Sequence, residues 1–508
     1  MSSLSSYFDH DFNTLREQWE STLLKELKLP EIGNKAQKKL VSGQSWPTLS
    51  LEASSSVQLP SSEWKKASNT YSYLVESEIE RDLKEDLESG VRNFFFYKEV
   101  LSNTRWNTIE RVIAEFPLKD EVEVFVLGGG YQSQKIKVID SIISGEAFHD
   151  QGGHSIQELG LLAKNLVDNL DNLVNDVYLG VYVDSHFFHN IAKIRAAKLL
   201  GMKILKEAGK NNAIKVVALT SFQGWTLFER YSNMLRNETA VASAYIAGAD
   251  HIQSAGYNTV TELETNNFEA EHIERSRRMA RNSAHVLALE SMLGLVQDAA
   301  FGSYHLENLT EALCEESWKT MQELLKGTDL TAEVTKVREE RLKMIKTRKT
   351  VLSGTNDYPD VKETLNLKLK SPKVFRISRV FEELRLKMEE LTHKPTVYVV
   401  VYGDYAALNG RLNFVKNYFE LLGLTVKESG HGETDLGKCL SERTEEIIVF
   451  CSSDDQYSEM LPYASQVKTK HKFVAGKNEI SGFKNLFAGQ NVYEVLESIV
   501  KDFSGEAK

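Results

Sequence analysis

Cysteine is scarce in this 508-residue sequence, and long hydrophobic runs are missing. Cys314, Cys439 and Cys451 stand far apart, with neither the CxxC spacing of a zinc site nor the density of a secreted disulfide framework. No run of about 18 apolar residues occurs. Residues 1–12 also lack the basic and apolar stretches of a signal peptide. We therefore expect reduced thiols, no membrane span, no export signal and a cytoplasmic location.

An excess of basic charge is also absent. The chain has 61 Lys and Arg residues against 72 Asp and Glu residues, which gives a net charge of −11. Such a balance offers no basic field for nucleic acid or for an anionic membrane surface. With 42% hydrophobic residues and only 8 prolines, the composition is that of a folded globular protein. We expect neither a nucleic-acid partner nor a membrane partner, and the length predicts roughly three domains.

The hydrophobic pattern predicts four segments. Residues 1–70 combine helical spacing with a Ser- and Pro-rich stretch, which indicates an N-terminal arm and linker. In residues 71–330, β-rich runs alternate with helical runs, which predicts βα units and a parallel sheet; their number favours a closed (β/α)8 barrel of the TIM type. Residues 331–394 form a charged helical linker. The expected strands of the barrel are residues 94–97, 122–127, 136–143, 177–183 and 216–220.

Residues 395–508 predict a second α/β domain. A continuous apolar strand at 396–402 is followed by a loop at 403–410 and a helix that ends near residue 423. Further strands at 446–450 and 471–475 complete the pattern of an open, doubly wound sheet.

Several segments of the first α/β region resemble the methylmalonyl-CoA mutase family. They occur in the family's order at residues 191–197 (IAKIRAA), 224–236 (GWTLFERYSNMLR), 278–291 (RMARNSAHVLALES) and 302–310 (GSYHLENLT). Several ordered matches are a far more specific signal than one short motif. The resemblance implies an acyl-CoA mutase barrel, a radical rearrangement that depends on adenosylcobalamin, and a flavodoxin-like, cobalamin-binding domain at the carboxyl end.

Two further segments resemble one branch of this family. Residues 152–159 (GGHSIQEL) and 451–453 (CSS) are similar to the small, non-catalytic subunit of the heterodimeric enzymes. The resemblance implies a heterodimer with a catalytic large subunit. In the family, the N-terminal arm wraps the other subunit, and here the arm carries an apolar stripe with Phe12, Trp19 and Leu23. Packing of that stripe on this chain's own barrel is the alternative.

The residues that hold the substrate in catalytic members are replaced here. Alignment back from residue 191 puts Asp176 and Tyr178 where the family has a substrate-binding Arg and Ser, and the resemblance puts Leu219 and Ser221 at the positions of a His and a Gln. Only His149, in a segment similar to the family's Tyr-His-x-Gln, matches a catalytic residue. It is either a working acid or a retained structural histidine.

The cobalamin-binding loop is degenerate in the same way. The family's Asp-x-His-x-x-Gly motif supplies the lower axial ligand of cobalt through its His, and the Asp orients that His. Here Asp404 is retained, Ala406 stands at the position of the His, and Gly410 comes one residue late. A methyl group cannot coordinate cobalt. We expect no cofactor and no metal in this chain, and adenosylcobalamin on the partner chain.

These observations favour the small subunit of a methylmalonyl-CoA mutase, whose holoenzyme interconverts methylmalonyl-CoA and succinyl-CoA. In this hypothesis the chain is itself inactive, pairs with the large subunit and stabilises it, and aromatic residues such as Phe95, Phe125 and Tyr178 fill the barrel axis. Two alternatives stay open. One is a divergent, catalytically active acyl-CoA mutase that uses His149, and the other is a free-standing scaffold for cobalamin enzymes.

Overall fold

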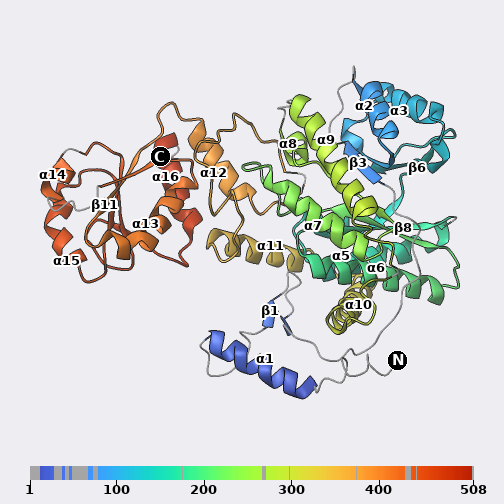
Figure 1. Ribbon diagram of the computed structural model, residues 1–508, viewed down its shortest axis with the longest axis horizontal. Helices are drawn as coiled ribbons and strands as arrows, with labels where there is room; N and C mark the ends of the chain where they lie inside the picture. Colours follow the sequence, from blue (N-terminus) through green and yellow to red (C-terminus); the bar gives the residue numbers. More distant parts are fainter. Residues whose placement is uncertain are drawn as a thin grey trace.

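The chain folds as a mixed α/β protein with parallel sheets (Figure 1). The computed structural model describes residues 12–27, 37–39, 45–47, 67–71, 78–173, 175–265, 270–296, 298–372, 374–429, 436–441 and 443–505. In the N-terminal arm it has helix α1 (Phe12–Leu27) and a small antiparallel pair, β1 (Gln37–Lys39) with β2 (Ser45–Pro47). The side chains of Phe12, Trp19 and Leu23, and thus the partner of the apolar stripe, lie outside the described residues.

Two four-stranded parallel sheets form the larger part of the molecule, and we call them with their helices the paired-sheet unit. The first sheet has the order β3 (Ala67–Tyr71), β4 (Val91–Tyr97), β5 (Glu123–Leu127), β6 (Lys137–Ile139). The second has the order β10 (His251–Ile252), β9 (Ile214–Thr220), β8 (Val177–Val183), β7 (Ile142–Ser144).

The two sheets adjoin at both edges, although no backbone ladder runs from one to the other among the described strands. At one edge only two residues separate β6 from β7, so the strand expected at 136–143 is in fact two strands, one in each sheet. At the other edge Thr70 Oγ1 donates to the Ser254 carbonyl at 2.9 Å, and Ser254 N donates to Ser68 Oγ at 3.2 Å.

The space between the two sheets is filled. One hydrophobic cluster joins residues of the first sheet to residues of the second, with the rings of Phe95 and Phe125 stacked at 4.7 Å. Its buried members are Phe95, Phe125, Ile139, Val217 and Leu219, and Tyr178 and Tyr182 pack against them.

Helices cover the outer faces of the paired-sheet unit, because the residues of each strand that point outward are also apolar (Figure 1). The helix α10 (Tyr304–Leu325) packs against α5 (Ser155–Asp168) and α6 (Phe187–Glu207). Short helices α4 (Glu146–Asp150) and α8 (Thr259–Glu264) follow β7 and β10. The other longer helices are α2 (Ile79–Glu88), α3 (Asn103–Glu115), α7 (Ser232–Ile246) and α9 (Ala270–His285).

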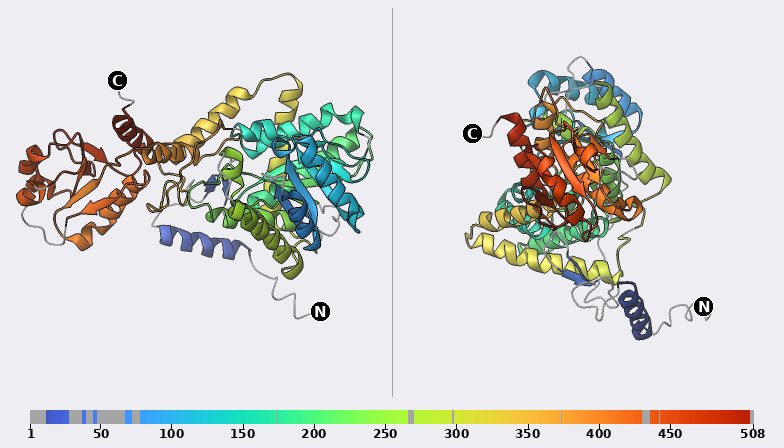
Figure 2. Two further views of the ribbon diagram at one scale, coloured as in Figure 1. Left: turned by 90° about the horizontal axis from the view of Figure 1, so that it is seen from above. Right: turned by 90° about the vertical axis from the view of Figure 1, so that its left-hand side faces the viewer.

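A five-stranded parallel sheet forms the carboxyl-terminal part and lies at the other end of the elongated molecule (Figure 2). Its order is β12 (Val426–Glu428), β11 (Val397–Val401), β13 (Ile447–Cys451), β14 (His471–Ala475), β15 (Lys484–Leu486). Helices α11 (Thr331–Lys346) and α12 (Arg379–Glu389) precede it.

Both faces of this sheet are buried, which explains why β11 and β13 read as continuous apolar runs rather than alternating ones. In β11, Val397, Val399 and Val401 face a core that includes α13 (Tyr405–Glu420) and α16 (Val492–Ser504), whereas Tyr398 and Val400 face one that includes α14 (Leu436–Ser441) and α15 (Tyr457–Met460). Within the described ranges, no helix is long and apolar enough to cross a bilayer.

Candidate functional site

A cavity of about 150 Å³ opens where strands of both four-stranded sheets end. Its walls come from the carboxyl ends of the strands and from the segment between α11 and α12, which contributes Ser371, Val374 and Arg376. The carboxyl ends of parallel strands are the usual place for ligands in such sheets. The volume is below the range of about 300–1,000 Å³ that is typical of small-molecule sites. From the strands and the turns after them, the lining includes Tyr97, Leu127, His149, Tyr182, Leu219, Thr220 and Gln253.

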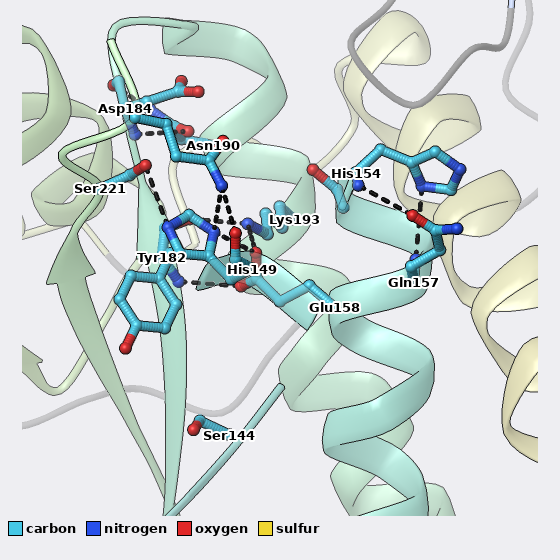
Figure 3. Close-up of polar contacts among 12 residues, drawn as sticks. Ser144, His149, His154, Gln157, Glu158, Tyr182, Asp184, Asn190, Lys193 and Ser221 are labelled. Atoms are coloured by element: carbon cyan, nitrogen blue, oxygen red, sulfur yellow. Dashed lines mark hydrogen bonds and ion pairs between the residues drawn. The ribbon is translucent and has the colours of Figure 1, made fainter. Parts of the chain in front are cut away.

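His149 is the centre of a buried polar network beside this cavity (Figure 3). Its helix, α4, follows β7, and its imidazole ring stacks on the ring of Tyr182 with 3.9 Å between centroids. Nδ1 lies 3.2 Å from Glu158 Oε2, and Nε2 lies 3.2 Å from Ser221 Oγ. The amide of Gln223 donates to the His149 carbonyl at 2.5 Å. The ring is therefore fixed by partners on both nitrogens and on one face.

Glu158 is held in its ionised form. Lys193 Nζ donates to Glu158 Oε2 at 2.7 Å, and the backbone N–H of Tyr182 donates to Oε1 at 3.0 Å. Burial alone would raise the pKa of this carboxyl group, but the Lys193 ammonium and the hydrogen bond with His149 outweigh burial and lower the pKa to about 2. A buried carboxylate with this many partners is a stable acceptor for the Nδ1–H of His149.

This geometry fixes where the proton of His149 lies. Because a carboxylate only accepts hydrogen bonds, Nδ1 carries the proton, and Nε2 accepts from the hydroxyl of Ser221. Burial lowers the pKa of His149, so the ring is neutral at neutral pH. The imidazole consequently presents no N–H to the cavity.

Ser221, His149 and Glu158 are connected in the order of a hydroxyl–imidazole–carboxylate triad. However, Ser221 is buried and is not part of the cavity wall, and Glu158 is already neutralised by Lys193. A nucleophile must reach its substrate, so this arrangement favours a structural role for the three residues over hydrolysis.

The network makes folding stability depend on pH. As the pH falls below about 6.5, the unfolded chain protonates His149 while the folded ring, with its lowered pKa, stays neutral, so stability is lost. We expect His149→Gln to reduce the fall in the urea midpoint between about pH 7.5 and about pH 5.5. The wild type and the variant both keep the buried histidines His154, His189 and His251. The contributions of these residues to the pH dependence of stability therefore cancel in the comparison. Equal pH slopes in variant and wild type would contradict this assignment.

The segment between α11 and α12 covers the cavity. Arg376 Nη2 lies 2.6 Å from Glu264 Oε2 and 2.7 Å from Glu382 Oε2, and Nη1 donates to the Trp225 carbonyl at 3.0 Å. The neighbouring ring of Phe375 packs on Gly152, where an added Cβ would come within 2.7 Å of the ring. The buried Arg376 network therefore holds the segment firmly over the ends of the strands.

Arg341 of α11 extends this cover. Its guanidinium lies 5.3 Å from the centre of the Phe375 ring, and it donates to Gln223 Oε1 at 2.7 Å and to the Gly152 carbonyl at 3.1 Å. The His149 network and the covering segment are thus connected through Gln223.

The loop after β11 in the five-stranded sheet is short. The expected loop at 403–410 is wrong, because α13 already begins at Tyr405, and Ala406 and Gly410 are helical. Asp404 caps that helix, since its Oδ1 accepts from Ala406 N at 3.0 Å. Gly403 has a φ of +113°, and a Cβ there would come 2.3 Å from the side-chain oxygen of Gln456. The space beside this loop is therefore already occupied by a side chain.

Residues 107–390, more than half of the chain, match the family model described as methylmalonyl-CoA mutase. The chain belongs to the methylmalonyl-CoA mutase family. It is 30% identical over 357 residues to the methylmalonyl-CoA mutase small subunit of Porphyromonas gingivalis, a match that covers 62% of this chain and 56% of that protein.

Two other mutase proteins are similar to this chain at lower identity. The small subunit of Propionibacterium freudenreichii subsp. shermanii is 27% identical over 361 residues, which is 63% of this chain and 54% of that protein. The methylmalonyl-CoA mutase of Rhizobium meliloti is 28% identical over 211 residues, 38% of this chain and 28% of the relative. The matched region thus spans a little over half of the length of the two small subunits.

Of the positions predicted from the mutase resemblance, the structure brings three together. His149 and Leu219 line the cavity, and Ser221 is bonded to His149. Tyr178 instead lies between the sheets, with its ring 6.3 Å from that of Phe125. Asp176 is exposed, directly before β8, at the opposite end of the strand from the cavity.

Sequence reasoning missed the residues that hold His149 and cover the cavity. Glu158, Lys193 and Gln223 lie in or next to segments that resemble the mutase family, but nothing in their spacing assigned them to His149. Arg341 and Arg376 come from distant parts of the chain, and no local motif marks them. The clearest available signal was a set of charged residues inside otherwise apolar helices, such as Lys193 within IAKIRAA.

The residues present around the loop after β11 offer little to a cobalamin. The sequence resemblance predicts Ala406 at the position of the axial ligand, and the Asp404 carboxylate is engaged as a helix cap. Among the described residues, no group of three or more His, Cys, Asp or Glu side chains could hold a metal ion. The loop after β11 thus has no donor set for cobalt.

Proposed function

We propose that this chain is the small, non-catalytic subunit of an adenosylcobalamin-dependent methylmalonyl-CoA mutase, the isomerase that interconverts methylmalonyl-CoA and succinyl-CoA. In this proposal the chain pairs with a catalytic large subunit, stabilises it, and leaves the cofactor to that partner. The observation that carries the proposal is the start of α13, where Asp404 caps the helix and the side chain of Ala406 has no atom that could coordinate cobalt. Two of the similar proteins are named as small subunits of methylmalonyl-CoA mutase, which supports the pairing.

The substrate side of the molecule supports the same proposal. A CoA thioester is a long molecule, and a cavity of about 150 Å³ beneath a covering segment is too small for it. The space between the sheets is filled by a hydrophobic cluster to which Phe95, Phe125 and Leu219 belong. The neutral His149 has both nitrogens engaged, which favours its interpretation as a structural histidine over a working acid.

We propose the finer architecture on the same grounds. Two parallel sheets that adjoin at both edges around a filled interior fit a TIM-type barrel. The five-stranded order of the last sheet, 2-1-3-4-5 in chain order, fits a flavodoxin-like domain. The proposed domains are the arm and linker (1–70), the barrel (71–330), the helical linker (331–394) and the degenerate cobalamin-type domain (395–508). The cytoplasmic location stays a prediction from the sequence.

A titration with adenosylcobalamin tests the proposal. We expect the purified chain to cause no change in the absorbance spectrum of the cofactor and no isomerisation of methylmalonyl-CoA. The large subunit of the same organism is the positive control, and a stable 1:1 complex of both chains should bind cofactor in the amount of its large subunit. Corrinoid bound by the isolated chain, or mutase activity without a partner, would overturn the proposal and favour a divergent active enzyme. Failure to form the complex would also overturn it.

A further inference from the structure

The segment from Val286 to Tyr304 exposes an unusual amount of apolar surface. It contains the π-helical turn η6 (Val286–Glu290) and the connection to α10. Seven of its large apolar side chains are between 41% and 67% exposed: Val286, Leu289, Met292, Leu295, Val296, Phe301 and Tyr304. Its sequence has only two charged residues, Glu290 and Asp298, and Asp298 is buried. We call the described residues of this stretch, 286–296 and 298–304, the apolar segment.

The apolar segment is held by contacts with the interior of the protein, so its exposed side chains stand on a fixed backbone. Leu287, Ala288 and Ala300 belong to the main hydrophobic core. Asp298 forms an ion pair with Arg195 of α6, a side chain with no exposed surface. The core contacts and the ion pair hold the backbone while the outward residues face solvent.

The backbone of the apolar segment is also strained. Met292 and Asp298 have φ values of 52° and 42°, a region that residues other than glycine rarely adopt. Strained backbone and π-helical turns persist where the surrounding structure enforces them, and they are common at functional positions. The strain is therefore consistent with a surface shaped for a partner.

The apolar segment lies away from the cavity. It begins after His285, whose ring is within 3.7 Å of the position that a Cβ on Gly90 would take, and Gly90 directly precedes β4. The segment therefore starts at the amino ends of the strands, whereas the cavity is at their carboxyl ends. A protein bound here would not need to touch the His149 network.

We propose that the apolar segment is the docking surface for the large mutase subunit. Aromatic side chains such as Phe301 and Tyr304 have about 150–250 Å² each. Together with the five aliphatic side chains, they present several hundred Å², on the order of the 300–600 Å² that is the largest apolar patch of a typical monomer. This area is a substantial part of the ~800 Å² per partner of a stable interface. Depletion of charge in the segment is also typical of an interface core. The inference rests on the proposed function, from which the large subunit follows as the protein that binds the apolar segment.

A charge-insertion experiment tests this surface. Leu289→Lys combined with Val296→Lys places two ammonium groups on residues that are already exposed, so the fold should tolerate them. The matched control is Val351→Lys combined with Leu461→Lys, two exposed apolar residues outside the segment. Affinity for the purified large subunit is measured by biolayer interferometry, with urea midpoints to compare stability. We expect roughly 100-fold weaker binding for the first variant and wild-type binding for the control.

The outcomes separate the inference from the proposed function. Wild-type affinity of the Leu289 and Val296 variant, while the wild-type chain binds the large subunit, would overturn the docking surface and leave the proposed function standing. Absence of binding by the wild-type chain would overturn both. A third outcome is that the chain alone forms a dimer, which the two lysines dissociate, while the affinity for the large subunit is unchanged. In that case a second copy of the chain binds the apolar segment, and the inference is wrong.

Discussion

Replacement of Arg376 by methionine is expected to lower the free energy of unfolding by about 3–5 kcal/mol, because it leaves the buried carboxylate of Glu382 without its cation and leaves Glu264 with Arg379 alone. Arg376 is 2% exposed, and its guanidinium contacts Glu264 and Glu382 together with the Trp225 carbonyl. Methionine preserves much of the volume, so the loss reflects charge and hydrogen bonding rather than a cavity. Urea denaturation followed by circular dichroism measures the change.

Two controls identify the cause of that loss. The triple variant Arg376→Met, Glu264→Gln, Glu382→Gln also removes the two buried carboxylate charges. It should recover a large part of the stability, since complete removal of a buried ion pair often changes the free energy of unfolding little. Arg111→Ala, which breaks an exposed ion pair with Glu80, should change stability little. A single Arg376→Met variant as stable as the wild type would show that the buried network does not stabilise the fold.

Arg195→Met is expected to cost a similar amount, about 3–5 kcal/mol. The Arg195 side chain is completely buried, pairs with Asp298, and donates through Nη2 to Glu307 at 2.9 Å. Because Asp298 belongs to the apolar segment, the loss should be accompanied by faster amide hydrogen exchange in residues 286–304. Denaturation and exchange mass spectrometry on the same preparation measure both effects.

The conservative variant Arg195→Lys separates charge from shape. Lysine keeps the positive charge but cannot contact two carboxylates with a planar fork, so a partial loss of stability is expected, smaller than that of the methionine variant. Equal exchange rates in residues 286–304 of the wild type and Arg195→Met would contradict a role of this ion pair in holding the apolar segment.

The strands of this chain could be predicted well from the sequence where both faces are buried. The expected bounds of β8 and β14, residues 177–183 and 471–475, are those of the structure. For β8, a continuous apolar run between Asp176 and Asp184 defines them. The break between β6 and β7 could not be predicted, since Asp140 and Ser141 interrupt the run only slightly, and pairing with different neighbours decides it.

The start of α13 was missed although its signal is in the sequence. Aspartate directly before a helical run is a strong N-cap, and Asp404 has this role. The hydrophobic pattern favoured a loop up to Gly410 instead. The local capping preference of Asp404 indicates the observed start of the helix, and that pattern does not.

The site was only partly predictable. His149 and Ser221 could be identified by resemblance, but their hydrogen bond joins residues far apart in the chain. Glu158 and Lys193 are brought to them by the packing of α5 and α6 on the strands, and such contacts leave no spacing rule in the sequence. Charged residues buried in apolar helices indicate that a partner exists without indicating which one.

The helix α12 contributes to two separate interiors at once. Glu382 accepts from Leu227 N at 2.8 Å and from Arg376, which ties the helix to the paired-sheet unit, whereas Phe381, Leu384 and Met388 are part of the core of the five-stranded sheet. A rotation of the five-stranded sheet relative to the paired-sheet unit would therefore have to expose apolar side chains or break buried ion pairs. Because α12 is part of both interiors, we expect the two parts to move together as one rigid body.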